Sequence, residues 1–170
     1  MADHLDFDGL VTAYYGMLYQ FAFSLTRDEA SACDLAQQTF CIWAAKGHQL
    51  RDKTKVKTWL FTTLHREFLG TRRRESRFPH IELDFAAAEL PAITPPSVNR
   101  LDSAQVLKAL GQLDDIYQAP VALFYLQDYS YNEIAETLDV PLGTVKSRLT
   151  RGLSRLHQLL TVTSTPPSTP

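Results

Sequence analysis

The sequence predicts an all-α protein with two small helical domains joined by a flexible linker, the C-terminal domain being a helix-turn-helix. Apolar residues recur at the spacing of one helix face over most of the 170 residues, and no stretch alternates as a strand does. Four prolines and three acidic residues interrupt the helical rhythm between residues 77 and 99. We therefore expect a first domain over residues 5–76, a linker over 77–99, a second domain over 100–160 and a disordered tail over 161–170.

The first domain is expected to contain three helices. The first is amphipathic over residues 7–25, begins among aspartates that suit a helix N-terminus, and ends at a break at residues 27–28. The second is expected to end at Gly47, because glycine is common at the C-terminal cap of a helix. A polar loop over residues 48–55 then leads into a third helix that starts near Val56 and ends in a run of arginines.

The second domain is expected to begin with two short helices, and the linker before it to hold one helical turn over residues 85–90. The apolar stripe of the first short helix is formed by Leu101, Ala104, Leu107 and Leu110. Gly111 ends that helix. The next helix is expected over residues 119–127, with Pro120 in its first turn, where the missing N–H costs no hydrogen bond.

The last two helices form the most informative local pattern. Ser130 and Glu133 make a capping box ahead of a short helix that stops at residues 139–141, and a longer helix is expected over residues 142–160. The buried stripe of the longer helix is expected to consist of Val145, Leu149, Leu153, Leu156 and Leu160. A capped helix, a three-residue turn and a longer basic helix are typical of a helix-turn-helix, whose second helix enters the major groove of DNA.

The exposed face of the longer helix supplies candidate DNA contacts. The residues nearest to the bases would be Leu142, Gly143, Thr144, Lys146, Ser147 and Arg148. Arg151 and Arg155 lie further along the helix, where contacts with phosphates would position it without specifying sequence. The competing interpretation is an ordinary helical hairpin with a solvated basic face.

Charge is distributed unevenly along the chain, although the formal net charge is only −2. Residues 46–77 carry ten basic and three acidic residues, and residues 140–170 carry four basic and no acidic residues. Between them, residues 78–139 carry two basic and ten acidic residues. This pattern indicates two surfaces for a polyanion, one in each domain. A pI near 6.2 argues against tight, indiscriminate binding of nucleic acid by the free chain.

Composition excludes several classes of protein. With 45% hydrophobic and 21% charged residues, the chain resembles neither a collagen, a disordered protein nor a disulfide scaffold. No apolar run approaches the roughly 20 residues of a membrane span, and residues 1–8 lack the basic residues of a secretory signal. Cys33 and Cys41 are interpreted as reduced thiols of a cytoplasmic protein, with packing favoured over metal ligation. We expect neither a metal nor a cofactor.

Several segments resemble one protein family. Residues 129–149 closely resemble the C-terminal domain of bacterial sigma factors of the extracytoplasmic-function (ECF) type, and residues 140–149 are the most specific match. Residues 34–40 resemble the helix with which this family binds the polymerase clamp, and residues 57–64 resemble the helix that follows. The matching basic end of that helix is Arg72, Arg73 and Arg74. The resemblance covers about residues 5–160, in the same order and spacing.

The resemblance implies an alternative sigma factor that binds core RNA polymerase and directs promoter recognition and melting for transcription initiation. For docking on the β′ clamp it implies Asp34, Leu35, Gln37, Gln38 and Phe40. For the melted −10 element it implies Gln49, Leu50, Arg51, Lys53, Lys55, Lys57, Arg66, Arg72, Arg73 and Arg74. Asp52 is a further candidate for the pocket that holds a flipped base. Trp59 either faces the melted strand or packs in the core, and core packing is favoured.

For the −35 element the resemblance implies that the second domain docks on the β flap and inserts its last helix into the major groove. The residues involved would be Thr144, Lys146, Ser147, Arg148, Arg151 and Arg155. Many relatives are held by an anti-sigma factor, so such a partner is a further expectation.

The clamp-binding segment departs from the family pattern at two positions. Cys33 and Gln38 stand where the family usually has glutamates. Because the clamp surface in this family is basic, losing two carboxylates should weaken docking. Phosphorylation by a kinase at Ser31, Thr39 or a nearby threonine would restore negative charge, and a polymerase with an altered surface would be another compensation.

Two other functions compete with the sigma factor. A stand-alone helix-turn-helix regulator would explain residues 129–149 but not the matches at residues 34–40 and 57–64. An enzyme is disfavoured, because the five histidines do not cluster in the sequence and neither a phosphate-binding loop, a zinc-protease motif nor a nucleophile elbow is present.

Overall fold

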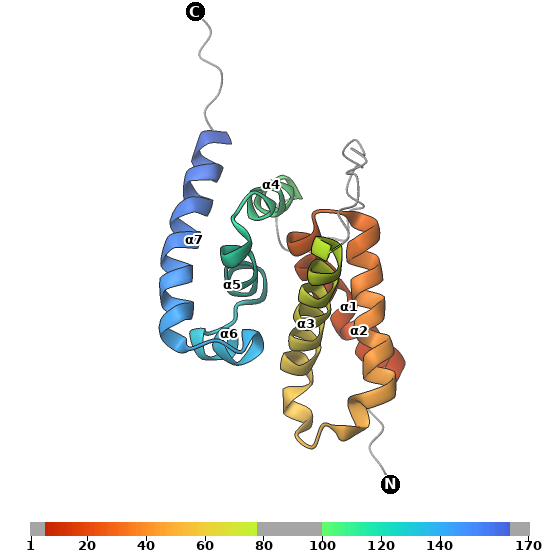
Figure 1. Ribbon diagram of the computed structural model, residues 1–170. Helices are drawn as coiled ribbons and strands as arrows, with labels where there is room; N and C mark the ends of the chain where they lie inside the picture. Colours follow the sequence, from red (N-terminus) through yellow and green to blue (C-terminus); the bar gives the residue numbers. More distant parts are fainter. Residues whose placement is uncertain (1–5, 78–99, 164–170) are drawn as a thin grey trace, which may run out of the picture. The chain divides into compact units, whose positions relative to one another are not determined.

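The computed structural model describes residues 6–77 and 100–163, and these residues form helices joined by short turns (Figure 1). The chain divides into two compact units, residues 1–91 and 92–170. The all-α class and the helix-turn-helix in the second unit are confirmed. The expected linker, its helical turn at residues 85–90 and the tail lie outside the described residues, except for the ends of two helices.

The first unit is a three-helix bundle. Its helices are α1 (Phe7–Thr26), α2 (Glu29–Lys46) and α3 (Val56–Arg77). The core side chains with no exposed surface include Leu18, Phe21, Ala36, Leu60, Phe61 and Leu64. The ring centroids of Phe21 and Phe61 lie 5.4 Å apart, and this contact joins α1 to α3. Burial of these apolar side chains is the main source of the stability of the bundle.

The break between α1 and α2 is confirmed at Arg27 and Asp28. Arg27 adopts a left-handed backbone with φ 59°, and its N–H donates to the carbonyl of Phe23, which ends α1. The Asp28 carboxylate accepts hydrogen bonds from the Ser31 N–H at 2.8 Å and the Ser31 hydroxyl at 2.6 Å. Asp28 is therefore the N-cap of α2.

Gly47 ends α2 as expected, but for a different reason. Its φ is −59°, so the left-handed conformation that favours glycine is not used. A Cβ at this position would instead lie 2.5 Å from Cδ2 of Trp43. The backbone of Gly47 packs on the indole ring, and only glycine leaves the space for that contact. Two 3₁₀ turns follow, η1 (Gly47–Gln49) and η2 (Lys53–Lys55).

The second unit contains four helices. They are α4 (Arg100–Gly111), α5 (Asp115–Gln127), α6 (Tyr131–Leu138) and α7 (Leu142–Thr163). The structure corrects the stripe expected for α4: Ala104 is exposed and Leu107 half-buried, whereas Val106, Ala109 and Leu110 are buried. The helix is rotated because its contacts with α5 and α7 decide which face is covered.

The start of α5 differs from the prediction. The helix begins at Asp115, four residues before the expected start, so Pro120 lies inside it rather than in its first turn. Pro120 and the residues on either side are buried. Asp114 is an extended N-cap residue and Asp115 is an acidic first-turn residue. These start signals outweigh the proline, whose missing N–H leaves the carbonyl of Ile116 without its helical donor.

The contact between α7 and α5 includes a glycine that the predicted stripe omits. A Cβ at Gly152 would lie 2.5 Å from Cγ2 of Val121, so the two helices approach closely at this point. Val145, Leu149 and Leu156 are buried as expected, but Leu153 and Leu160 are only half-buried. Within residues 6–77 and 100–163, no helix has both the length and the apolar character needed to cross a membrane.

Candidate nucleic-acid interface

The helix-turn-helix is held by hydrogen bonds at both ends of α6. The N–H of Ser130 donates to the Glu133 carboxylate at 2.7 Å, and the N–H of Glu133 donates to the Ser130 hydroxyl at 3.2 Å, which is the expected capping box. At the other end, Asp139 is left-handed with φ 54° and ends the helix. Backbone N–H groups of Thr144 and Val145 then donate to the carbonyl of Pro141, where α7 begins. The turn therefore fixes the direction of α7 relative to α6.

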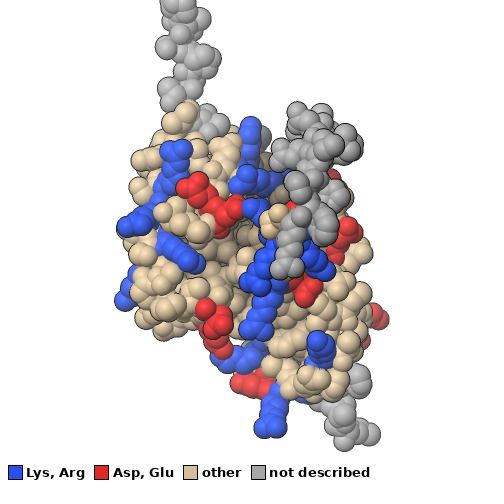
Figure 2. Space-filling model, viewed as in Figure 1, with Lys and Arg blue, Asp and Glu red and all other residues tan. Residues whose placement is uncertain are grey.

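The outward face of α7 carries the predicted cationic side chains. Lys146, Ser147, Arg151 and Arg155 are exposed, and Thr144 and Arg148 are half-buried. Figure 2 shows Lys and Arg side chains along α7 and also along α3. The Ser147 hydroxyl donates to the carbonyl of Thr144, and the Arg155 guanidinium donates to Gln158 Oε1 at 3.3 Å. A continuous face with hydroxyl and cationic donors is suited to base edges and phosphates in a major groove.

The loop between α2 and α3 presents a second set of candidates. Gln49, Arg51, Lys53 and Lys55 are exposed, whereas Leu50 and Lys57 are half-buried. Asp52 is also exposed, and its carboxylate accepts from the Thr54 N–H at 3.0 Å and the Thr54 hydroxyl at 2.6 Å. These bonds, and to a smaller extent Lys55, lower the pKa of Asp52 below its ordinary value.

Trp59 packs on the core and is partly exposed. Its ring meets the ring of Trp43 edge to face, with 5.0 Å between centroids and 76° between planes. Trp43 is 8% exposed, whereas Trp59 remains half-buried. Trp59 therefore packs against the core while part of its side chain stays at the surface beside the loop.

The basic end of α3 is exposed. Arg66, Arg72, Arg73 and Arg74 all lie at the surface. The guanidinium carbon of Arg72 is 5.7 Å from the centre of the Phe68 ring, a cation–π contact that orients its side chain. Because α3 begins directly after the loop, the loop cations and these arginines belong to one continuous segment.

The residues of α2 that are predicted to dock on the polymerase clamp separate into two groups. Asp34, Gln37 and Gln38 are exposed and available to a partner. Leu35 and Phe40 are 9% and 5% exposed, so they belong to the core. Phe40 contacts the rings of Phe7 and Tyr15, at 6.4 and 6.3 Å between centroids. Phe40 supports the helix from inside, whereas Leu35 also lines the hollow beside the outer face.

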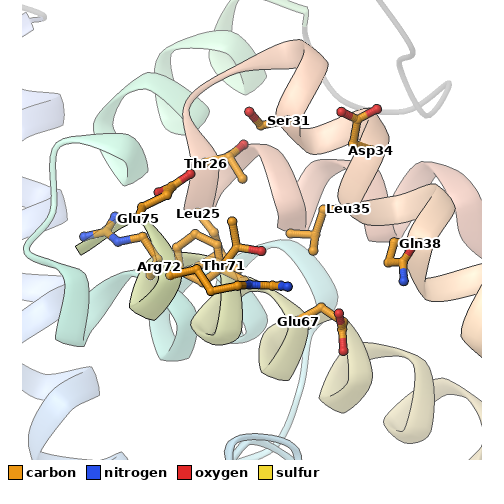
Figure 3. A pocket seen from close by; sticks show the side chains of 12 residues that line it. Leu25, Thr26, Ser31, Asp34, Leu35, Gln38, Glu67, Thr71, Arg72 and Glu75 are labelled. Carbon is orange, nitrogen blue, oxygen red and sulfur yellow. The ribbon is translucent and has the colours of Figure 1, made fainter. Parts of the chain in front are cut away.

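A hollow of about 560 Å³ adjoins that outer face. Figure 3 shows side chains around it that come from the α1–α2 junction and from α3. Asp34 and Gln38 line it from α2, and Glu67 and Arg72 line it from α3. Sequence patterns did not identify Glu67, because it lies in another helix and matches no motif. Its position on the same hollow as Gln38 is a property of helix packing.

Each of the two units matches the model of a known protein family. The model of Sigma-70 region 2 matches residues 10–78, and the model of Sigma-70, region 4 matches residues 103–156. The ECF RNA polymerase sigma factor SigL of Mycobacterium tuberculosis is 32% identical over 143 residues, covering 82% of this chain and 80% of the relative. This chain belongs to the ECF RNA polymerase sigma factors.

Two further relatives agree with this family. SigM of Bacillus subtilis, an ECF RNA polymerase sigma factor, is 28% identical over 153 residues, covering 89% of this chain and 93% of the relative. The structure of the sigma factor RpoE in complex with the anti-sigma factor NepR, from Bartonella quintana, matches with a TM-score of 0.74 and 32% identity. That match covers 92% of this sigma factor and 98% of RpoE. The protein is thus an alternative sigma factor that directs transcription initiation.

Burial changes two expectations for this sigma factor, one about phosphorylation and one about the packing of a cysteine. Thr39 is fully buried and its hydroxyl donates to the carbonyl of Leu35, so a kinase cannot reach it in the folded helix. Ser31 is exposed, and its hydroxyl is the one bonded to Asp28. Cys33 is half-buried and accepts from the Tyr15 hydroxyl at 3.8 Å, whereas Cys41 is exposed and is not the packing residue that was expected.

Proposed function

We propose that this sigma factor docks on core RNA polymerase through the exposed face of α2 and reads promoter DNA with two separate surfaces. The exposed cationic face of α7, which lies inside the region 4 match and follows the capped helix α6, is the observation that carries the proposal. Such a helix fits the major groove of the −35 element. Lys146, Ser147 and Arg148 would meet base edges, while Arg151 and Arg155 would meet phosphates.

The second surface would bind the melted −10 strand. The loop over residues 47–55 offers exposed Gln49, Arg51, Lys53 and Lys55 within the region 2 match. A single strand needs cations for its phosphates and surfaces on which unstacked bases can lie. The half-buried Leu50 and Trp59 would supply the apolar surfaces, and the arginines of α3 would hold the adjoining backbone.

Docking on the polymerase would use Asp34, Gln37 and Gln38, the exposed predicted residues of α2. With only one carboxylate among them, attraction to the basic β′ clamp would be weak, and docking of region 4 on the β flap would add to it. A protein partner is proposed as well, because the related RpoE is solved with an anti-sigma factor. We propose that these partners are met in the cytoplasm and that the protein has no enzymatic activity of its own.

The test is binding of the full chain to core RNA polymerase by fluorescence anisotropy, followed by transcription from a bound promoter. Asp34→Ala should weaken core binding, and Asp8→Asn, an exposed aspartate outside α2, should leave it unchanged. Specific binding of duplex DNA by the free chain without any core binding would instead support a stand-alone regulator. Equal core binding of Asp34→Ala and wild type would contradict the proposed docking face.

A further inference from the structure

The loop between α2 and α3 is closed by hydrogen bonds within itself. The Leu50 N–H donates to the carbonyl of Gly47 in the first turn, and the Lys55 N–H donates to the carbonyl of Asp52 in the second, both at 3.0 Å. The Asp52 carboxylate holds the second turn by accepting from the N–H and the hydroxyl of Thr54. This pair, called here the Asp52–Thr54 clasp, spans Lys53 and is flanked by Arg51 and Lys55, and all three of these cations are exposed.

The chemistry of the clasp argues against a direct role for Asp52 in binding DNA. Both hydrogen bonds, one of them only 2.6 Å long, fall on the same carboxylate oxygen, Oδ1, and leave that oxygen with less capacity for a base donor. Its negative charge would also repel the phosphates that the neighbouring cations attract. Keeping an acidic residue in a cationic loop therefore needs another explanation, and the shape of the loop supplies one.

We propose that Asp52, through its hydrogen bonds to Thr54, is a positioning residue that preorganises the loop over residues 47–55 for base-specific capture of single-stranded DNA. This inference rests on the proposed role of the loop at the −10 element. The cations of the loop provide affinity for any strand, whereas selectivity for a base needs a fixed arrangement of Gln49, Leu50 and Arg51. Loss of the clasp would make the loop flexible, and we expect base selectivity to fall more than the overall affinity for single-stranded DNA.

Two substitutions at the same position separate shape from charge. Asp52→Asn and Asp52→Ala both remove the negative charge, but asparagine retains an oxygen that can accept from Thr54. Thr54→Val removes the hydroxyl donor while leaving the Asp52 carboxylate in place. A positioning role predicts that Asp52→Ala and Thr54→Val lose base selectivity and that Asp52→Asn largely keeps it.

A second clasp in the same unit provides the matched control. Asp28 accepts from the N–H and hydroxyl of Ser31 at 2.8 and 2.6 Å, which repeats the chemistry of the Asp52–Thr54 clasp at the start of α2. Asp28→Ala therefore removes an equivalent cap away from the loop. If selectivity fell because of general destabilisation, Asp28→Ala would lower it as well.

The experiment uses each full-length variant assembled with core RNA polymerase. The holoenzyme selects from a pool of short single-stranded DNA with a randomised centre, and sequencing gives the base preference at each position. Overall affinity for the pool and affinity for core polymerase are measured in parallel. We expect Asp52→Ala to lower the preference for the favoured base by roughly threefold or more, with overall affinity unchanged or higher because one repulsive charge is lost.

Three outcomes would overturn the inference. One is wild-type preference in Asp52→Ala. Another is loss of preference in Asp52→Ala and Asp52→Asn but not in Thr54→Val, which would mean that the carboxylate itself contacts a base. The third is equal loss of preference in Asp28→Ala. A wild-type holoenzyme that selects no base would overturn the proposed −10 role as well, and normal core binding would show that docking survives that failure.

Discussion

The backbone of Gly47 lies directly against the indole of Trp43, and a Cβ at position 47 would come within 2.5 Å of Cδ2 and 2.6 Å of Cε2. Trp43 in turn meets Trp59 edge to face. The end of α2, the start of the loop and the first turns of α3 are thereby joined through one aromatic contact. The shape of the candidate −10 loop depends on this contact as well as on its own hydrogen bonds.

Gly47→Ala should consequently destabilise the first unit by about 1–3 kcal/mol, because the indole or the loop has to move to admit the methyl group. The measurement is denaturant unfolding of the full chain, followed by tryptophan fluorescence. Gly16→Ala is the control, since nothing lies within 4 Å of a Cβ at that position of α1. That substitution should be neutral or stabilising by up to about 1 kcal/mol. Equal stability of the two variants would contradict the contact.

Tyr19→Phe should stabilise the protein. Among the described residues nothing forms a hydrogen bond with the Tyr19 hydroxyl, which is buried, and an unsatisfied buried hydroxyl costs on the order of 1 kcal/mol or more. Burial, reinforced by the negative charge of Glu29, also raises the pKa of Tyr19 from 10.0 to about 12. We therefore expect a higher melting temperature for Tyr19→Phe at pH 7.

The same substitution predicts a pH dependence. Between pH 10 and 12 the phenol of Tyr19 ionises in the unfolded chain but stays protonated in the folded protein. Its contribution to stability is complete below pH 10 and is lost as the pH rises towards 12. Tyr19→Phe should thus lose less stability than wild type on raising the pH through this window. Parallel unfolding curves for the two proteins across it would disprove the assignment.

Gln38→Glu should strengthen binding to core polymerase. Gln38 is exposed and lines a hollow that also contains Asp34 and Arg72, so an added carboxylate would add negative charge to this surface without being buried. We expect a gain of roughly threefold at low salt that shrinks as ionic strength rises. Binding titrations at two salt concentrations provide the measurement. An unchanged affinity at low salt would show that the clamp does not contact this position.

Cys33→Glu is expected to behave differently from Gln38→Glu, although both restore a family glutamate. Cys33 is half-buried beside Tyr15, and a carboxylate there would be partly desolvated. It should lower the melting temperature, whereas Gln38→Glu should not. Thermal unfolding of both variants separates the two effects, and matching melting temperatures would contradict the role of burial.

Ser130→Ala should weaken the start of α6 by about 1 kcal/mol, because the Glu133 N–H loses its acceptor. The expected readout is faster hydrogen exchange at Glu133 and Ile134. Asn132→Ala, a neighbouring exposed position outside the capping box, serves as the control. The loss of binding free energy for duplex DNA should be smaller than the loss of stability at the start of α6, because the buried Ile134 and Leu138 still hold α6 in place. Unchanged exchange in Ser130→Ala would mean that the cap contributes nothing.

The secondary structure and the family could be predicted because their signals are local. The capping box at Ser130 and Glu133, the break at Arg27–Asp28 and the periodicity of α7 each lie within one or two helical turns of sequence. Errors arose where two local signals conflicted. Pro120 indicated a first turn, but Asp114 and Asp115 start α5 four residues earlier.

Residue roles at the surfaces needed long-range packing. Leu35 and Phe40 share a motif with Asp34 and Gln38, yet contacts with α1 bury Phe40, and Leu35 is only 9% exposed. Gly47 was expected as a cap for its backbone freedom, whereas the ring of Trp43 is what requires it. Asp52 is predicted as a candidate for the reading pocket, and its hydrogen bonds to Thr54 depend on the path of the turn. Short-range propensities determine which helices form and in what order. The exposure of a side chain and its hydrogen-bond partners depend instead on neighbours distant in sequence or on the exact path of a turn.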